Sequence, residues 1–170
     1  ITIGASDAAG EKFGIGMAAG YTNNNRPSEN KVGHIVNMAG STITVGNENS
    51  IGMYASGAGS TAENFGTIKV TAKKGIGMYL ENGATGYNRA GGLIEIDPSA
   101  QNAIAVYSTG GTTVFKNYGT IRLKAPDSKG IVTANNAQGT NETGGIIDVQ
   151  HSSAEATKKI EGTAGGDKKF

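Results

Sequence analysis

Residues 75–79 read GIGMY, residues 51–54 read IGMY and residues 14–17 read GIGM. The isoleucine of this opening motif recurs at Ile15, Ile51, Ile76, Ile104 and Ile131, with a degenerate sixth copy at Ile160. Successive copies are separated by 36, 25, 28, 27 and 29 residues. A period of this length is typical of proteins that stack one structural unit on the next. We therefore interpret each copy as the same strand in a successive coil.

A second motif alternates with the first. Its copies read GSTITV at 40–45, GTIKV at 66–70, GLIEI at 92–96, GTIRL at 119–123 and GGIIDV at 144–149. Its last apolar residue advances from Val45 to Val70, Ile96, Leu123 and Val149, in steps of 25, 26, 27 and 26. An asparagine precedes every copy, at Asn37, Asn64, Asn88, Asn117 and Asn141. The alternation of apolar and polar residues predicts short strands with one buried face.

Strands that repeat at this interval without intervening helices predict an all-β fold, a right-handed parallel β-helix of about five to six coils. A leucine-rich repeat has a similar period but needs many leucines, and this chain has only Leu80, Leu93 and Leu123. We expect residues 1–170 to form a single β-helix domain with a repeat of about 25–29 residues. The spacing is widest between Met17 and Asn37, which indicates a long loop insertion at 20–33.

The motifs predict which side chains share a column. The opening motif should place Ile15, Ile51, Ile76, Ile104 and Ile131 inside, beside Met17, Met53, Met78 and Val106. The second motif should add the inward columns of Ile43, Ile68, Ile94, Ile121 and Ile147 and of Val45, Val70, Ile96, Leu123 and Val149. Because a narrow core of this kind buries few side chains, we expect stacked asparagines and backbone ladders to contribute much of the stability.

Two outward columns are also predicted. One reads Thr44, Lys69, Glu95, Arg122 and Asp148, so the charges alternate in sign and should form a single exposed row. The other follows the methionines and reads Ala18, Tyr54, Tyr79, Tyr107 and Ala134. Its three tyrosines are candidates for a stripe that binds sugar or protein. The competing interpretation, which we favour, is a structural ladder half covered by loops.

Composition and motifs bear on the class of function. The chain has 15 basic and 14 acidic residues, so the basic surplus typical of a nucleic-acid binder is missing. It has no cysteine, and neither histidine has a partner at the spacing of a metal site. No motif of a catalytic nucleophile is found. We therefore expect no enzyme, no cofactor and no metal. Polysaccharide lyases also use β-helices, so the alternative is a carbohydrate-active protein, a lyase or a hydrolase-like enzyme. Against this alternative, the carboxylates of Asp97, Asp127 and Asp148 in this chain are spread over separate coils.

The insertion at 20–33 provides the remaining candidate site. Insertions in repeat proteins map to one face and often bind a partner. Within it, Asn24 and Arg26 join Tyr54, Tyr79 and Tyr107 as candidate partner-binding residues. A surface loop without function is an equally good interpretation.

The coupled motifs, in Gly75–Tyr79, Ile51–Tyr54, Asn64–Val70 and Asn117–Leu123, resemble the passenger domains of large bacterial autotransporter adhesins of type V secretion. The resemblance implies a right-handed β-helix, exported through an outer-membrane β-barrel and displayed on the bacterial cell surface. It implies attachment to a host or bacterial surface protein or glycan, and contact with neighbouring coils of a longer chain. Because neither signal peptide nor barrel is found, we expect this chain to be a passenger fragment, attached to a membrane only through the missing barrel.

Overall fold

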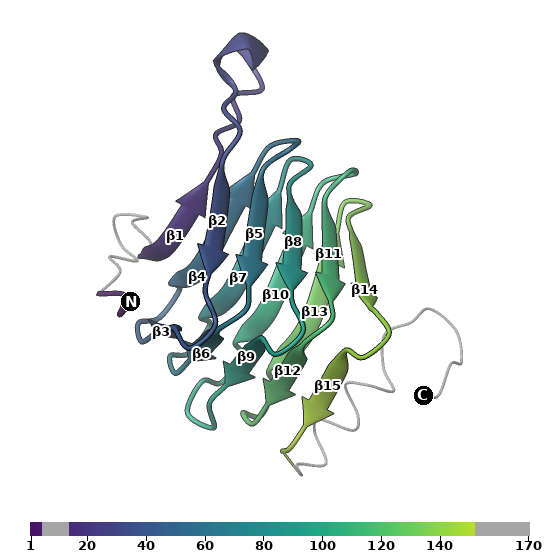
Figure 1. The fold of residues 1–170 in the computed structure, drawn as a ribbon. Coiled ribbons are helices and arrows are strands. Elements are labelled where there is room, and N and C mark those ends of the chain that lie inside the picture. Colours follow the sequence, from purple (N-terminus) through teal and green to yellow (C-terminus); the bar gives the residue numbers. More distant parts are fainter. Residues whose placement is uncertain (5–13, 152–170) are drawn as a thin grey trace.

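The chain winds into a parallel β-solenoid in the computed structural model, which describes residues 1–4 and 14–151 (Figure 1). Each coil adds one strand to each of three five-stranded parallel sheets, which we call sheets I, II and III. The five strands of each sheet are separated by about four full turns of the chain, slightly fewer than the five to six coils predicted. The all-β solenoid is confirmed, and the right-handed winding stays a prediction. Ile160, the degenerate sixth copy of the opening motif, lies outside the described residues.

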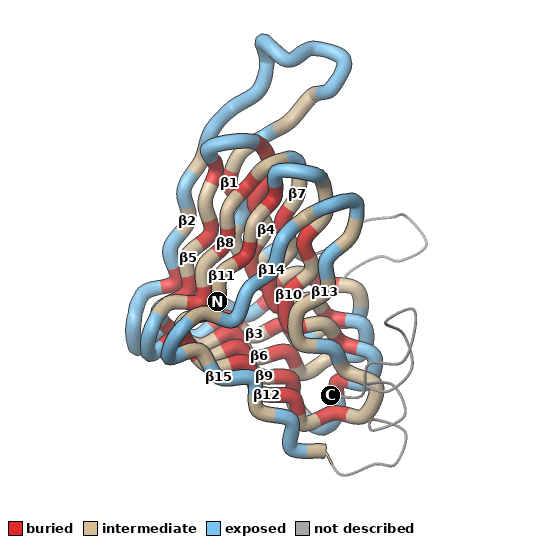
Figure 2. The backbone as a smooth tube through the Cα atoms, turned by 90° about the vertical axis from the view of Figure 1, so that its right-hand side faces the viewer, coloured by how far each residue is buried: buried red, intermediate tan, exposed pale blue. Residues whose placement is uncertain are grey.

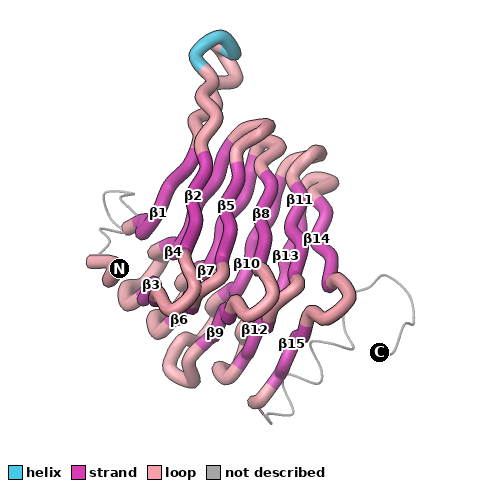
Figure 3. Tube along the Cα trace, in the orientation of Figure 1, coloured by secondary structure: helices cyan, strands magenta, loops and turns pink. Residues whose placement is uncertain are grey.

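The strands follow one another in the order I, II, III along the chain (Figure 3). Sheet I contains β1 (Ile15–Ala19), β4 (Ile51–Ser56), β7 (Ile76–Glu81), β10 (Ile104–Thr109) and β13 (Lys129–Ala134). Sheet II contains β2 (His34–Asn37), β5 (Thr61–Asn64), β8 (Thr85–Asn88), β11 (Val114–Asn117) and β14 (Gln138–Asn141). Sheet III contains β3 (Thr42–Val45), β6 (Thr67–Val70), β9 (Leu93–Ile96), β12 (Thr120–Leu123) and β15 (Ile146–Val149). A single turn of 3-10 helix, η1 (Pro27–Glu29), lies in the loop between β1 and β2.

Sheet III confirms the register predicted from the second motif. Ile43, Ile68, Ile94 and Ile121 are paired strand to strand and have no exposed surface. Val45, Val70, Ile96 and Leu123 form the parallel column. In the last coil that the structure describes, Ile147 and Val149 occupy the same columns but are 42% and 45% exposed. Figure 2 shows the buried positions recurring at equivalent points of successive coils.

Sheet II was recognised from the sequence only by its asparagines. Each of its strands ends on one of them, and they are paired in register. Every Nδ2 donates to the Oδ1 of the next asparagine, at 2.7 Å from Asn37 to Asn64, 2.8 Å to Asn88, 2.8 Å to Asn117 and 2.7 Å to Asn141. The predicted stacking is therefore a continuous ladder of side-chain amides, and only its last member is exposed.

The inward position predicted for the isoleucines of the opening motif is wrong for Ile15, Ile51, Ile76 and Ile104. Ile51, Ile76 and Ile104 are half-buried, whereas the two residues after each of them are buried. The alternation of faces is therefore interrupted at the residue after the isoleucine, which is a glycine in β4 and β7 and Ala105 in β10. A Cβ on Gly52 would lie 2.5 Å from the carbonyl oxygen of Gly77 and 3.1 Å from Ile68 Cγ2. The glycine thus faces the core where the next strand approaches too closely for a side chain. The isoleucine before it is turned to the outer face.

The register predicted for the last coil is also wrong, by two residues. Ile104 pairs with Lys129 and Val106 pairs with Ile131, so Ile131 continues the methionine column and packs against the core. Tyr107 pairs with Val132, and Ala134 pairs with Thr109. The tyrosine column therefore ends in Val132, not in Ala134.

The first residues of the chain lie beside β3. Thr2 forms a parallel bridge with Thr44, and Ile3 is only 5% exposed. Residues 1–3 thus lie against β3 as a strand of a preceding coil would, with Ile3 covering the core, a feature that the sequence motifs did not reveal. In the described part of the chain, no helix is long and apolar enough to cross a membrane.

Candidate functional site

A hollow of about 470 Å³ lies on the outer face of sheet I. Its lining comes from β1, β4, β7 and the turns before β4 and β7: Ile15, Asn49, Ile51, Tyr54, Lys74, Ile76, Tyr79 and Glu81. The isoleucines that interrupt the strand alternation supply its apolar floor. The volume falls in the range of small-molecule and side-chain binding pockets.

The predicted tyrosine column forms one wall of this hollow. Tyr54 pairs with Tyr79 and Tyr79 with Tyr107 in adjacent strands. Their ring centroids are 5.8 Å and 5.2 Å apart, with interplanar angles of 34° and 37°. Each ring therefore packs on the next, as in the ladder interpretation, while Tyr54 and Tyr79 also line the hollow. Partner binding by the three tyrosines stays a prediction.

Glu81, the last residue of β7, makes one end of the hollow polar. Its Oε1 accepts hydrogen bonds from Tyr54 OH at 2.6 Å, from Asn82 Nδ2 at 3.1 Å and from Ser56 Oγ at 3.4 Å. Burial and the hydrogen bond to Glu81 raise the pKa of Tyr54 to about 12. Burial and the nearby Glu81 charge also raise the pKa of Tyr79. Both hydroxyls thus stay protonated beside a carboxylate.

The opposite end of the hollow contains a cation that is already paired. Lys74 Nζ lies 3.0 Å from Glu48 Oε1, and both side chains are more than half exposed. Asn49, beside it, adopts a positive φ of 59° in the turn before β4. Since β7 separates Lys74 from Glu81, the hollow is basic at one end and acidic at the other.

The loop at 20–33 stands away from the stack beyond β1 and β2 (Figure 1). Its base is closed by an antiparallel bridge between Tyr21 and Lys31. Asn24 and Arg26 are exposed near η1, where Arg26 Nη1 pairs with Glu29 Oε1 at 3.1 Å. Neither residue lines the hollow. The candidate residues therefore fall into two places, and their role in binding stays a prediction.

The charged row on sheet III is confirmed in register. Lys69, Glu95, Arg122 and Asp148 pair strand to strand. Arg122 Nε lies 2.9 Å from Asp148 Oδ2, and Arg122 Nη1 lies 3.8 Å from Glu95 Oε2. These side chains are half-buried rather than fully exposed, because each partly covers the next.

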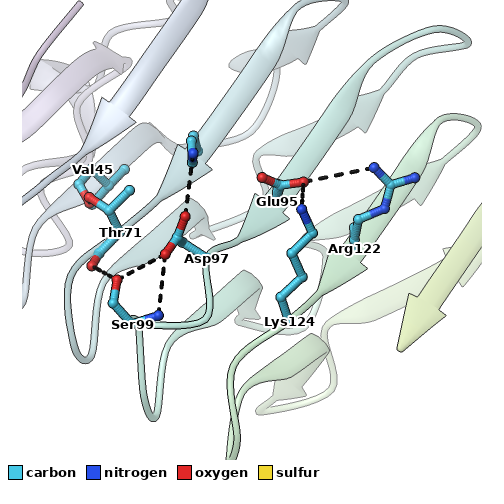
Figure 4. A network of polar contacts seen from close by, with 8 residues as sticks. Val45, Thr71, Glu95, Asp97, Ser99, Arg122 and Lys124 are labelled. Carbon is cyan, nitrogen blue, oxygen red and sulfur yellow. Dashed lines mark hydrogen bonds and ion pairs between the residues drawn. The ribbon is translucent and has the colours of Figure 1, made fainter. Parts of the chain in front are cut away.

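Two residues outside the predicted row complete this network (Figure 4). Lys124 Nζ lies 2.8 Å from Glu95 Oε2, and Lys69 Nζ lies 3.3 Å from Asp97 Oδ2. Burial opposes ionisation of Asp97, but the hydrogen bonds from Ser99 and the contact with Lys69 outweigh it and lower its pKa. Acidic and basic groups that are spread along the sequence thus meet on one face. No group of three or more potential metal ligands occurs among residues 1–4 and 14–151.

Sequence reasoning found the tyrosines of the hollow but missed Glu81, and it assigned Ile15, Ile51 and Ile76 to the core. One signal was available, the invariable glycine after each of these isoleucines, which marks a break in strand alternation. Glu81 has no such signal, because its position two residues beyond Tyr79 is occupied by Ser56 and Thr109 in the neighbouring coils.

Comparison with known proteins gives one result. A family model described as the BigA third pectate lyase-like domain matches residues 2–92, slightly more than half of the 170 residues. No curated protein and no solved structure matches the chain.

Proposed function

The chain belongs to the family of the BigA third pectate lyase-like domain, and from this membership we propose that it is a structural and adhesive module displayed on the bacterial cell surface. Its partner would be a host or bacterial surface protein or glycan. The supporting observation is the hollow on sheet I, an apolar and aromatic recess held on a rigid stack of strands. Recesses of this kind on rigid elements are typical of binding sites.

The same proposal includes the route to the surface. The resemblance to autotransporter passengers, together with the parallel solenoid, favours export by type V secretion. A solenoid can form coil by coil because each coil contacts only its neighbours. Export could therefore proceed without a completed fold.

Adhesion is tested by coating beads with the chain and counting beads retained on epithelial cells and on bacterial cells under flow. Two variants separate the candidate surfaces. Ile51→Ser with Tyr79→Ser alters the hollow, and replacement of residues 20–33 by the short Gly57–Ser60 turn removes the protruding loop. We expect retention of the unmodified chain and a loss with the hollow variant. Absence of retention on every surface would contradict the proposal.

A second candidate function, a carbohydrate-active protein, is favoured by the charged network of sheet III. Arg122 lies between the carboxylates of Glu95 and Asp148, and Lys124 is in contact with Glu95. Cleavage of a polysaccharide by general acid–base catalysis uses acidic and basic side chains held on one face, where they can exchange protons with the substrate. Incubation with a panel of polyuronates and neutral polysaccharides, with detection of new reducing ends, tests this candidate. If the chain cleaves a polysaccharide and Arg122→Gln abolishes the cleavage, catalysis is its function and the adhesive proposal is wrong.

A further inference from the structure

Glu81 is unusual among the described acidic residues because no cation pairs with it. Ion pairs join Glu29 to Arg26, Glu48 to Lys74, Glu63 to Arg89, Glu95 to Lys124, Asp97 to Lys69 and Asp148 to Arg122. Among the lysines and arginines that the structure describes, none makes an ion pair with Glu81, whose partners Tyr54, Ser56 and Asn82 are neutral donors. Glu142 also bonds to a neutral donor, Thr140, but it lies outside the hollow.

The molecule contains a completed version of this arrangement elsewhere. On sheet II, the Arg89 guanidinium lies 3.8 Å from the centroid of the Tyr87 ring and its Nη2 is 2.7 Å from Glu63 Oε2. Glu63 and Tyr87 face each other on adjacent strands. An aromatic ring and a carboxylate together satisfy a guanidinium, since one offers the face of its π system and the other a charge-assisted hydrogen bond.

The hollow on sheet I provides the same two groups without a cation at the carboxylate, because Lys74 lies at the other end and pairs with Glu48. The carboxylate of Glu81 lies at the end of the wall formed by Tyr54 and Tyr79. Ile51 and Ile76 line the hollow from the start of their strands, on the far side of the tyrosines from Glu81, and offer an apolar surface that suits methylene groups. A hollow of about 470 Å³ is far larger than a bare ammonium ion needs and is large enough for a long side chain.

We infer that the hollow binds a basic side chain of a partner protein, an arginine by preference, with its guanidinium at Glu81 and its stem on Tyr54 and Tyr79, directed toward Ile51 and Ile76. The arginine is preferred because Arg89 already occupies the equivalent arrangement with Tyr87 and Glu63. This inference rests on the proposed adhesive function and specifies the chemistry of its partner. Recognition of a membrane through quaternary ammonium headgroups is the competing outcome.

The test titrates the whole chain with three short capped peptides that differ only in a central arginine, alanine or glutamate. Methyl resonances of Ile51 and Ile76, assigned by NMR, report binding in the hollow. We expect the arginine peptide alone to shift them. Glu81→Gln keeps an acceptor for Tyr54 but removes the charge, so it should weaken binding about tenfold or more, the effect of losing one charge-assisted hydrogen bond. The matched control is Glu142→Gln, which should leave the affinity unchanged.

Three results would overturn the inference. The arginine peptide could leave the methyl resonances unmoved, the glutamate peptide could shift them equally, or Glu81→Gln could bind as tightly as the unmodified chain. Tetramethylammonium that shifts the resonances where the arginine peptide does not would assign the site to a lipid headgroup instead.

Bead retention on cells separates this inference from the proposed function. If beads coated with Glu81→Gln are still retained on cells, the adhesive function is supported but Glu81 and the hollow do not contribute to it. If the arginine peptide binds in the hollow but coated beads are not retained on any cells, the binding site is supported and the adhesive function is contradicted.

Discussion

Side-chain size in the core is compensated within each coil. Ala55, Leu80 and Ser108 occupy one column of sheet I, and Ala62, Gly86 and Phe115 occupy one column of sheet II. Within one coil Ala55 therefore occurs with Ala62, in the next coil Leu80 occurs with Gly86, and in the coil after that Ser108 occurs with Phe115. A Cβ on Gly86 would collide with Leu80 Cδ1 and lie 2.8 Å from Met78 Sδ. The glycine is therefore required by the leucine of the same coil, and close packing makes such pairs interdependent.

This dependence predicts a non-additive double substitution. Gly86→Ala alone should cost about 1–3 kcal/mol by overpacking, and Leu80→Ala alone about 2–5 kcal/mol by leaving a cavity. The double variant recreates the Ala55 and Ala62 pair of the preceding coil, so its loss should fall short of the sum by about 1 kcal/mol or more. Denaturant unfolding of the four proteins measures the coupling. Strict additivity would show that the two residues are independent.

The raised pKa of Tyr54 predicts that the protein loses stability at alkaline pH. A tyrosine in an unfolded chain has a pKa of about 10, whereas burial and the Glu81 contact raise that of Tyr54 to about 12. The folded state therefore holds the phenolic proton more tightly. The resulting stability is complete below about pH 10 and is lost as the pH rises toward about 12. Denaturation midpoints of the unmodified chain and of Tyr54→Phe across this window test it; equal slopes for the two would be contrary to the prediction.

The predicted burial of single residues failed where a glycine interrupts the two-residue period of a strand. The strict two-residue period of a strand assigned both Ile51 and Met53 to the interior, but Gly52 also faces inward and so reverses the isoleucine. A glycine in a strand indicates that the alternation of inward and outward side chains is interrupted, but it does not indicate which neighbouring residue is turned outward. The hollow could not be predicted for this reason, because its floor consists of residues that the pattern assigned to the core.

At the scale of strands, the asparagine ladder links sheet II along its whole length. Asn88→Ala would leave Asn117 Oδ1 without its donor in the buried ladder, while Asn64 Nδ2 would keep only its bond to the Leu93 carbonyl. Unsatisfied buried amides cost about 1–3 kcal/mol each, so we expect a loss in this range. Asn141→Ala is the matched control, since Asn141 ends the ladder and is exposed. Thermal unfolding compares them, and an equal loss at both positions would mean that burial of the ladder contributes nothing.

The charged row of sheet III predicts a dependence on salt. Arg122→Gln removes the cation between Glu95 and Asp148, and we expect a loss of about 1 kcal/mol at low ionic strength. This loss should shrink toward zero in about 1 M NaCl, where the Debye length is about 3 Å. Arg26→Gln is the control, because the Arg26 pair with Glu29 is largely exposed in the loop. An Arg122→Gln effect that does not respond to salt would indicate a packing role for the arginine stem.

At the scale of the whole molecule, repetition made the architecture predictable. The second motif recurs with nearly constant spacing, so the columns of sheet III and the asparagine ladder could be derived from it. The last coil could not be aligned, because Ile131 resembles the opening motif while the backbone pairs it with Val106. Sheet II was missed for a different reason, since its inward column varies from Ile35 and Ala62 to Phe115 and shows no repeated letter.

A stack in which each coil contacts only its neighbours should be most stable in its middle. Ile94 has covered coils on both sides and no exposed surface, whereas Ile147 fills the same column in the last coil and is 42% exposed. Ile94→Ala should therefore cost about 2–5 kcal/mol, and Ile147→Ala well under half of that. Amide exchange should likewise be slowest in β6, β9 and β12 and faster in β15. The pair of isoleucines makes the test sharp, because residue, strand position and column are the same and only the coil differs. Equal losses at Ile94 and Ile147, with uniform exchange along sheet III, would mean that the solenoid unfolds as one unit and that stability does not decline toward its last coil.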